Sequence, residues 1–135
     1  MPTPQALSTE PTRVLLVDDD EMVLAGLSAT LESDGFQVVA SPSGYAALDE
    51  LSRGRFALVI TDLMMPGLSG IAVLERVRVV APETPVVVLS GYPRRSLAEE
   101  ALSKGAGEFL IKPVDYTVLR KTMRSLLGEE GVIRG

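Results

Sequence analysis

Cysteine, histidine and tryptophan are all absent from this chain of 135 residues. Without cysteine, the chain has neither a disulfide framework nor a thiolate metal site. Without histidine, it has no Ser-His-Asp triad, no Cys-His pair and no zinc site built on imidazole. Any chemistry must therefore use carboxylates, hydroxyls, lysine, the backbone or a hard cation.

Long apolar runs and long basic runs are missing too. No apolar stretch approaches the roughly 20 residues that span a bilayer. Residues 1–12 lack the basic and apolar regions of a secretory signal. The net charge is −5, and the longest basic run is a pair of arginines, which argues against binding to nucleic acid or to an anionic membrane. We therefore expect a soluble, cytoplasmic protein with no direct nucleic-acid or membrane partner.

The chain does contain enough apolar residues, 46% of the total, to bury the core of one domain. Short β-branched runs alternate with stretches whose apolar residues have helical spacing. Strands are predicted at 13–17, 36–40, 57–61, 85–90 and 108–111, and helices at 21–35, 43–54, 69–80, 96–105 and 115–127. This alternation predicts an α/β fold, a (βα)5 parallel sheet with helices on both faces.

The predicted helices carry start signals. Ser43, Ser69 and Asp115 stand where N-caps are expected, and Ser96 with Glu99 fits a capping box. No internal repeat or second domain is visible. The chain is expected to divide into a disordered lead-in, one domain, and a tail or linker start: residues 1–12, 13–127 and 128–135.

Polar side chains follow four of the five predicted strands, at the edge where ligands bind to open parallel sheets. In chain order they are Asp18, Asp19 and Asp20, then Asp62, then Ser90, then Lys112. Each has an ordinary alternative: an N-cap for Asp20, a turn for Asp62 or Ser90, and a solvated surface for Lys112. If the four positions did not form one site, all of these ordinary alternatives would have to be true at the same time. We therefore interpret the four positions as one site.

Such a site suits a metal ion and a phosphoryl group. Clustered carboxylates repel one another unless a cation joins them. With no histidine or cysteine present, the cation expected is Mg²⁺, with Mn²⁺ as an alternative. An aspartate can itself accept a phosphoryl group, while an ammonium and a hydroxyl stabilise the phosphoryl oxygens.

Four motifs carry a resemblance to a known family: "VDDD" at 17–20, "ITDLMMPGLSG" at 60–70, "VVVLSGY" at 86–92 and "LIKPV" at 110–114. Together and in this order, they resemble the receiver domain of two-component response regulators. The resemblance covers about residues 13–127. It implies a doubly wound, flavodoxin-like sheet of strand order 2-1-3-4-5.

The resemblance also implies roles for the acidic residues. Asp62 corresponds to the phosphoacceptor. Asp18 and Asp19 correspond to the acidic pair that holds Mg²⁺, with Asp19 binding directly and Asp18 through water. Met64 occupies a position whose backbone carbonyl coordinates the metal. Asp20 is more consistent with a cap for the helix that follows.

Other positions correspond to the family's switch. Ser90 matches the switch hydroxyl and Phe109 the aromatic switch residue. Lys112 matches the phosphate-binding lysine, which precedes a cis peptide to Pro113 in the family. The implied donor is a histidine kinase or a phosphotransfer protein. Phosphorylation would draw Ser90 toward the phosphate, turn Phe109 inward and repack the face of the fourth helix, fifth strand and fifth helix.

The resemblance implies a signalling switch rather than an enzyme, with a homodimer through that repacked face as one output. The side chains of Met64 and Tyr92 would flank the phosphoryl group, and neither readily delivers a water molecule, so slow self-dephosphorylation is expected. The chain could be a free-standing regulator, or a receiver cut from a hybrid sensor kinase or a longer transcriptional regulator.

Two other classes of protein share some of these features. A haloacid-dehalogenase-type phosphatase also uses aspartate, lysine and Mg²⁺, but it expects Asp-x-Asp on the nucleophile's strand, where this chain has Asp62-Leu63-Met64. A flavodoxin needs a hydroxyl-rich and glycine-rich loop after its first strand. Three aspartates at that place would repel the cofactor's phosphate.

Overall fold

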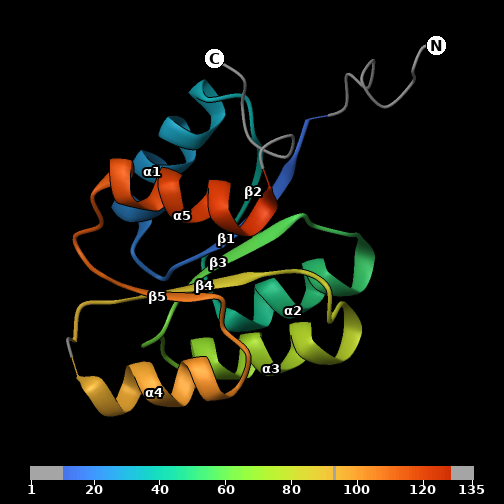
Figure 1. The fold of residues 1–135 in the computed structure, drawn as a ribbon. Coiled ribbons are helices and arrows are strands. Elements are labelled where there is room, and N and C mark those ends of the chain that lie inside the picture. Colours follow the sequence, from blue (N-terminus) through green and yellow to red (C-terminus); the bar gives the residue numbers. More distant parts are fainter. Residues whose placement is uncertain (1–10, 93, 129–135) are drawn as a thin grey trace.

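The computed structural model describes residues 11–92 and 94–128, in which five strands alternate with five helices (Figure 1). The strands are β1 (Arg13–Val17), β2 (Gln37–Ser41), β3 (Leu58–Asp62), β4 (Val86–Ser90) and β5 (Glu108–Ile111). The helices are α1 (Glu21–Ser33), α2 (Gly44–Arg53), α3 (Gly70–Val80), α4 (Arg95–Ser103) and α5 (Tyr116–Leu127). The predicted lead-in and tail lie outside the described residues, apart from positions 11, 12 and 128.

The five strands form one parallel sheet in the order β2-β1-β3-β4-β5. Helices α1 and α5 cover one face, and α2, α3 and α4 cover the other (Figure 1). This is the flavodoxin-like arrangement that the family resemblance implied. Parallel strands bring all their carboxyl ends to the same edge, so the polar residues at those ends are gathered at one place.

The strands are covered on both faces because their side chains alternate between two apolar layers. In β1, Val14 and Leu16 pack in the layer beneath α1 and α5, while Leu15 and Val17 pack in the layer beneath α2, α3 and α4. All four side chains are buried. In the part of the chain that the structure describes, no helix is both long enough and apolar enough to cross a membrane.

Three predicted helix caps are confirmed. The side chains of Ser43, Ser69 and Asp115 each accept a backbone N–H two or three positions ahead, at the starts of α2, α3 and α5. These bonds satisfy amide groups that have no partner inside the helix.

The capping box predicted at Ser96 and Glu99 is wrong. Helix α4 begins at Arg95, so Ser96 already lies within the first turn. The carbonyl of Arg94 accepts the first helical bonds, from Leu97 N and Ala98 N at 3.1 and 3.2 Å. No side chain caps this end of α4. The N-cap position of α4 is therefore Arg94, two residues earlier than the predicted Ser96.

Candidate functional site

Three aspartates meet at the carboxyl edge of the two central strands. Asp18 follows β1, and Asp62 is the last residue of β3, one position further into the strand than predicted. Both are buried, whereas the neighbouring Asp19 is exposed. One carboxylate oxygen from each of the three lies within 4.8 Å of the others. This cluster of oxygen ligands is able to hold a divalent cation.

Local hydrogen bonds fix the cluster and separate Asp20 from it. The backbone N–H of Asp18 donates to the carbonyl of Ser41 at 3.1 Å, and Asp18 Oδ1 accepts the backbone N–H of Asp20 at 2.9 Å. Asp20 turns its own carboxylate to the start of α1, where Oδ1 accepts Met22 N and Val23 N at 2.9 and 3.3 Å. Asp20 is therefore the N-cap, as predicted, and Asp18 faces the site.

Lys112 joins the two buried carboxylates. Its Nζ lies 2.8 Å from Asp18 Oδ2 and 3.5 Å from Asp62 Oδ2. The backbone N–H of Lys112 donates to the carbonyl of Ser90 at 2.8 Å, which holds the residue at the end of β5. The peptide to Pro113 is cis, as the family resemblance implied. The lysine thus reaches the centre of the sheet from the strand at its edge.

The electrostatics of the site favour additional positive charge. Burial raises the pKa of Asp62, and the nearby charge of Asp18 raises it further, against the opposing effect of Lys112. Burial acts to lower the pKa of Lys112, but its hydrogen bond to Asp18 and the charges of both aspartates outweigh burial and raise that pKa. Lys112 is therefore held in its charged form, yet one ammonium does not fully compensate two buried carboxylates.

An open recess of about 500 Å³ surrounds the charged groups. Its lining comprises Asp18, Asp19, Asp20, Asp62, Met64, Gly91, Tyr92 and Lys112. The predicted residues of the metal and phosphate site are thus brought together, Met64 included. The buried carboxylate of Asp62 forms part of the wall of this recess.

Two predicted residues lie beside the recess and are not part of its lining. Ser90 is fully buried at the end of β4, and its Oγ accepts the backbone N–H of Tyr92 at 3.0 Å. Phe109 lies half-buried on β5 and packs against the apolar layer beneath α2, α3 and α4. Both residues are next to the site through β4 and β5. Their roles as switch residues stay predictions.

Gly70, at the start of α3, is a further supporting residue that the sequence patterns did not single out. A Cβ added at Gly70 would lie 2.1 Å from the carbonyl oxygen of Asp62. That oxygen also accepts the hydroxyl of Thr61 at 2.9 Å. The helix can approach the backbone of Asp62 this closely only with glycine at position 70. The sequence shows a "Ser-Gly" pair at the start of the predicted helix. It does not show that the glycine lies against the backbone of Asp62.

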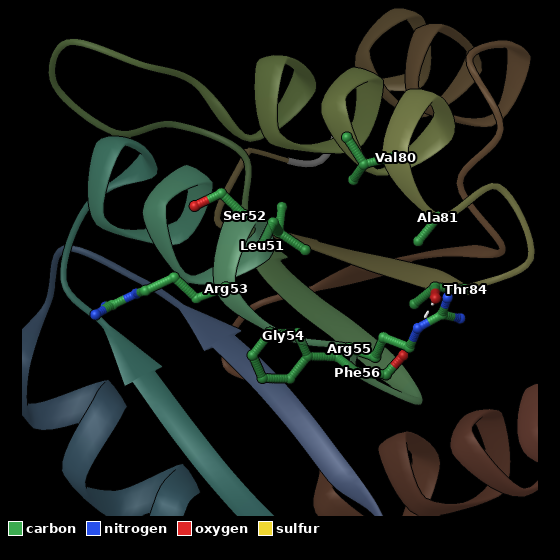
Figure 2. Close-up of a pocket in the computed structure, with 9 residues that line it drawn as sticks. All are labelled: Leu51, Ser52, Arg53, Gly54, Arg55, Phe56, Val80, Ala81 and Thr84. Carbon is green, nitrogen blue, oxygen red and sulfur yellow. Dashed lines mark hydrogen bonds between the residues drawn. The ribbon is translucent and has the colours of Figure 1, made fainter.

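A different hollow, of about 340 Å³, lies at the opposite edge of the sheet, near the ends of α2 and α3 (Figure 2). Its lining comprises Leu51, Ser52, Arg53, Gly54, Arg55, Phe56, Val80, Ala81 and Thr84. No carboxylate is among these residues, so this hollow offers neither a phosphoryl acceptor nor a ligand set for a hard cation. Of these two hollows, the recess at the carboxyl edge is the one lined by carboxylates.

Comparison with known proteins agrees with this geometry. The family model of the response regulator receiver domain matches residues 14–124, so the chain belongs to that family. It is a receiver domain of a two-component response regulator.

Among curated relatives, the response regulator protein FleR of Pseudomonas aeruginosa is 40% identical over 107 residues, which cover 79% of this chain and 23% of FleR. The uncharacterized transcriptional regulatory protein YkoG of Bacillus subtilis is 34% identical over 124 residues, covering 90% of this chain and 54% of YkoG. This chain therefore spans between about a quarter and about half of the length of these relatives.

Solved structures agree as well. A CheY-like receiver domain protein from Methanospirillum hungatei JF-1 has a TM-score of 0.85 at 26% identity, with 90% of this chain and 97% of that chain covered. The beryllofluoride-activated NtrC4 receiver domain dimer has a TM-score of 0.81 at 30% identity, with 87% and 97% covered.

Proposed function

We propose that Asp62 accepts a phosphoryl group from a histidine kinase or a phosphotransfer protein. The observation that carries this proposal is the contact of Lys112 Nζ with both Asp18 and Asp62, beside a recess open to solvent. Of the three clustered acids, Asp62 extends from the central strand β3, whose backbone is held on both sides. Such a fixed carboxylate is well placed to attack phosphorus.

The residues present fit a Mg²⁺ ion. Carboxylates of Asp18, Asp19 and Asp62 would hold it, together with the backbone carbonyl of Met64, and no softer ligand is available. When bound, Mg²⁺ supplies positive charge that neutralises the oxygens of the phosphoryl group. The raised pKa of Asp62 supports this assignment, because the carboxylate needs a cation to stay ionised at low cost.

The chemical step is a displacement at phosphorus. An oxygen of Asp62 forms the new O–P bond while the P–N bond of the donor's phosphohistidine breaks, and the imidazole nitrogen retains the electron pair. Lys112 then contacts a phosphoryl oxygen in place of one of its carboxylate partners. The hydroxyl of Ser90 leaves its bond with Tyr92 and donates to another phosphoryl oxygen.

The output surface is the face formed by α4, β5 and α5. Phe109 lies half-buried in β5 and would turn further inward as Ser90 moves. Each of the three elements exposes a large apolar side chain, and Leu102, Ile111 and Val118 are 48%, 44% and 46% exposed. Such a surface suits a homodimer, and a receiver dimer exists among the structural relatives.

The protein would act as a switch in the cytoplasm that takes part in its own phosphorylation and returns slowly to the unmodified state. Met64 and Tyr92 line the recess, and their side chains are more than half exposed. Neither carries an acid or an amide that could orient an attacking water. We expect a phosphoprotein half-life well beyond seconds when no phosphatase is present.

The test is labelling by acetyl phosphate or by a cognate kinase in the presence of Mg²⁺. Asp62→Asn should take up no phosphoryl group, whereas the matched control Asp49→Asn, an exposed position on α2, should be labelled like the wild type. Normal stoichiometry in Asp62→Asn would disprove the assignment. Sustained hydrolysis of a small phosphate ester would instead point to a phosphatase.

A further inference from the structure

A polar link joins α5 to α1. The hydroxyl of Tyr116, the first residue of α5, donates to Asp34 Oδ2 at 2.6 Å. Arg120, one turn further along α5, places its Nε 3.7 Å from the same oxygen. Asp34 directly follows the last residue of α1. These three residues, here named the α1–α5 clasp, fasten the first turns of α5 to the end of α1.

The clasp begins at Tyr116, four residues after Lys112, and the segment that joins the two residues lines a recess on the side facing α1. Strand β5 is at the edge of the sheet, and the backbone of Lys112 is held through its N–H bond to Ser90. Between this segment and α1 lies a recess of about 280 Å³. Its lining is mostly apolar: Met22, Val23, Gly26, Leu27, Thr30, Leu89, Lys112, Pro113, Val114 and Tyr116.

A recess of this size leaves room for residues 113–115 to move toward α1. The side chain of Lys112 forms part of the wall, so a shift of the segment would change the distance between the ammonium and the carboxylates. The carboxylates would stay, since they extend from the central strands β1 and β3. The position of the lysine therefore depends on what holds the start of α5.

We propose that Tyr116 is a positioning residue for Lys112, acting through its hydrogen bond to Asp34. This inference rests on the proposed phosphoryl transfer to Asp62. The clasp keeps the Lys112 ammonium within reach of the Asp62 carboxylate. The metal ligands do not depend on the clasp, so its loss should slow phosphorylation and leave Mg²⁺ binding intact.

The decisive variant is Tyr116→Phe, which keeps the ring and removes the hydroxyl. With acetyl phosphate as donor, its initial labelling rate should fall roughly tenfold, because displacing a reacting-site charge by up to about 1 Å is costly. The rise in melting temperature on adding Mg²⁺ should match that of the wild type. Tyr45→Phe is the control, since Tyr45 lies on α2 and is 63% exposed; it should label normally.

A second variant and a double variant separate positioning from general loss of structure. Asp34→Ala removes the acceptor of the same bond and should reproduce the slow labelling, while Asp34→Asn, which retains an acceptor oxygen, should recover part of the rate. In a Lys112→Ala background, Tyr116→Phe should slow labelling no further.

Three results would overturn the inference: wild-type rates in both Tyr116→Phe and Asp34→Ala, an equal additional loss in the Lys112→Ala background, or a parallel loss of the Mg²⁺ response. Labelling of Asp62→Asn would instead refute the proposed function, so the two failures can be told apart.

Discussion

Replacing Gly70 with alanine tests whether α3 contacts the backbone of Asp62. The new Cβ would lie 2.1 Å from the carbonyl oxygen of Asp62 and 2.9 Å from the Cα of Leu63, both backbone atoms. A Cβ atom essentially never lies within 3.0 Å of such a neighbour, so the distance to the carbonyl oxygen has to increase by about 0.9 Å. A flexible side chain could yield, but the end of a central strand cannot easily do so.

The cost can be estimated from overpacking. Forcing a methyl group against a rigid neighbour costs about 3 kcal/mol, and the gain from replacing a helical glycine returns roughly 0.5–1 kcal/mol. A net loss of about 2 kcal/mol corresponds to a fall in melting temperature of roughly 8 °C for a domain of this size. Thermal unfolding followed by circular dichroism would measure it.

Gly26 provides the matched control. It lies within α1, and a Cβ added there would meet nothing within 4 Å. Gly26→Ala should therefore raise the melting temperature by about 2–4 °C, through the helix preference of alanine alone. If Gly70→Ala melted at or above the wild-type temperature while Gly26→Ala behaved as expected, the close approach of α3 to Asp62 would be refuted.

Three further predictions concern the charged groups. Mg²⁺ at ten times its dissociation constant should stabilise the protein by about 1.4 kcal/mol, and Asp19→Asn should lose most of that gain; an unchanged melting temperature across a millimolar titration would contradict the metal site. Lys112→Met should lower the free energy of unfolding by about 2 kcal/mol in urea titrations, because two buried carboxylates lose their cation, and Mg²⁺ should restore part of it. Burial and the Asp34 carboxylate raise the pKa of Tyr116 above its ordinary 10.0, so the folded chain keeps a proton that the unfolded chain loses, and stability falls as the pH rises above 10. Tyr116→Phe should show a smaller fall, because the raised pKa of Lys112 still contributes in that range, and an equal loss in both proteins between pH 9 and 11 would argue against the hydrogen bond.

Much of the fold follows from local pattern. Strict alternation of buried runs and amphipathic stretches was enough to predict a parallel sheet with helices on both faces. The caps at Ser43, Ser69 and Asp115 could also be predicted from the sequence, because a cap accepts hydrogen bonds from amides only two or three residues away. The start of α4 could not, since Ser96 and Glu99 match the cap pattern but the backbone turn after β4 sets the register of the helix.

The composition of the site was predictable for a geometric reason. Parallel strands place their carboxyl ends together, so Asp18, Asp62 and Lys112 could be grouped although 94 positions separate Lys112 from Asp18. The bond between Tyr116 and Asp34, 82 positions apart, followed no such rule. This bond depends on how α5 packs beside the end of α1, and a local sequence pattern does not predict the packing of two helices.

The strand order has a mechanical consequence. β1 and β3 have a hydrogen-bonded neighbour on each side, whereas β5 has a neighbour on one side. Displacing a central strand breaks two ladders of hydrogen bonds, and displacing the edge strand breaks one. Asp18 and Asp62 lie at the ends of central strands, which are hard to displace. Lys112, which binds them, directly follows the edge strand β5, which is easier to displace. A phosphoryl group on Asp62 would therefore displace the segment around β5 more easily than the central strands. The exposed apolar side chains of α4, β5 and α5 lie at this same edge.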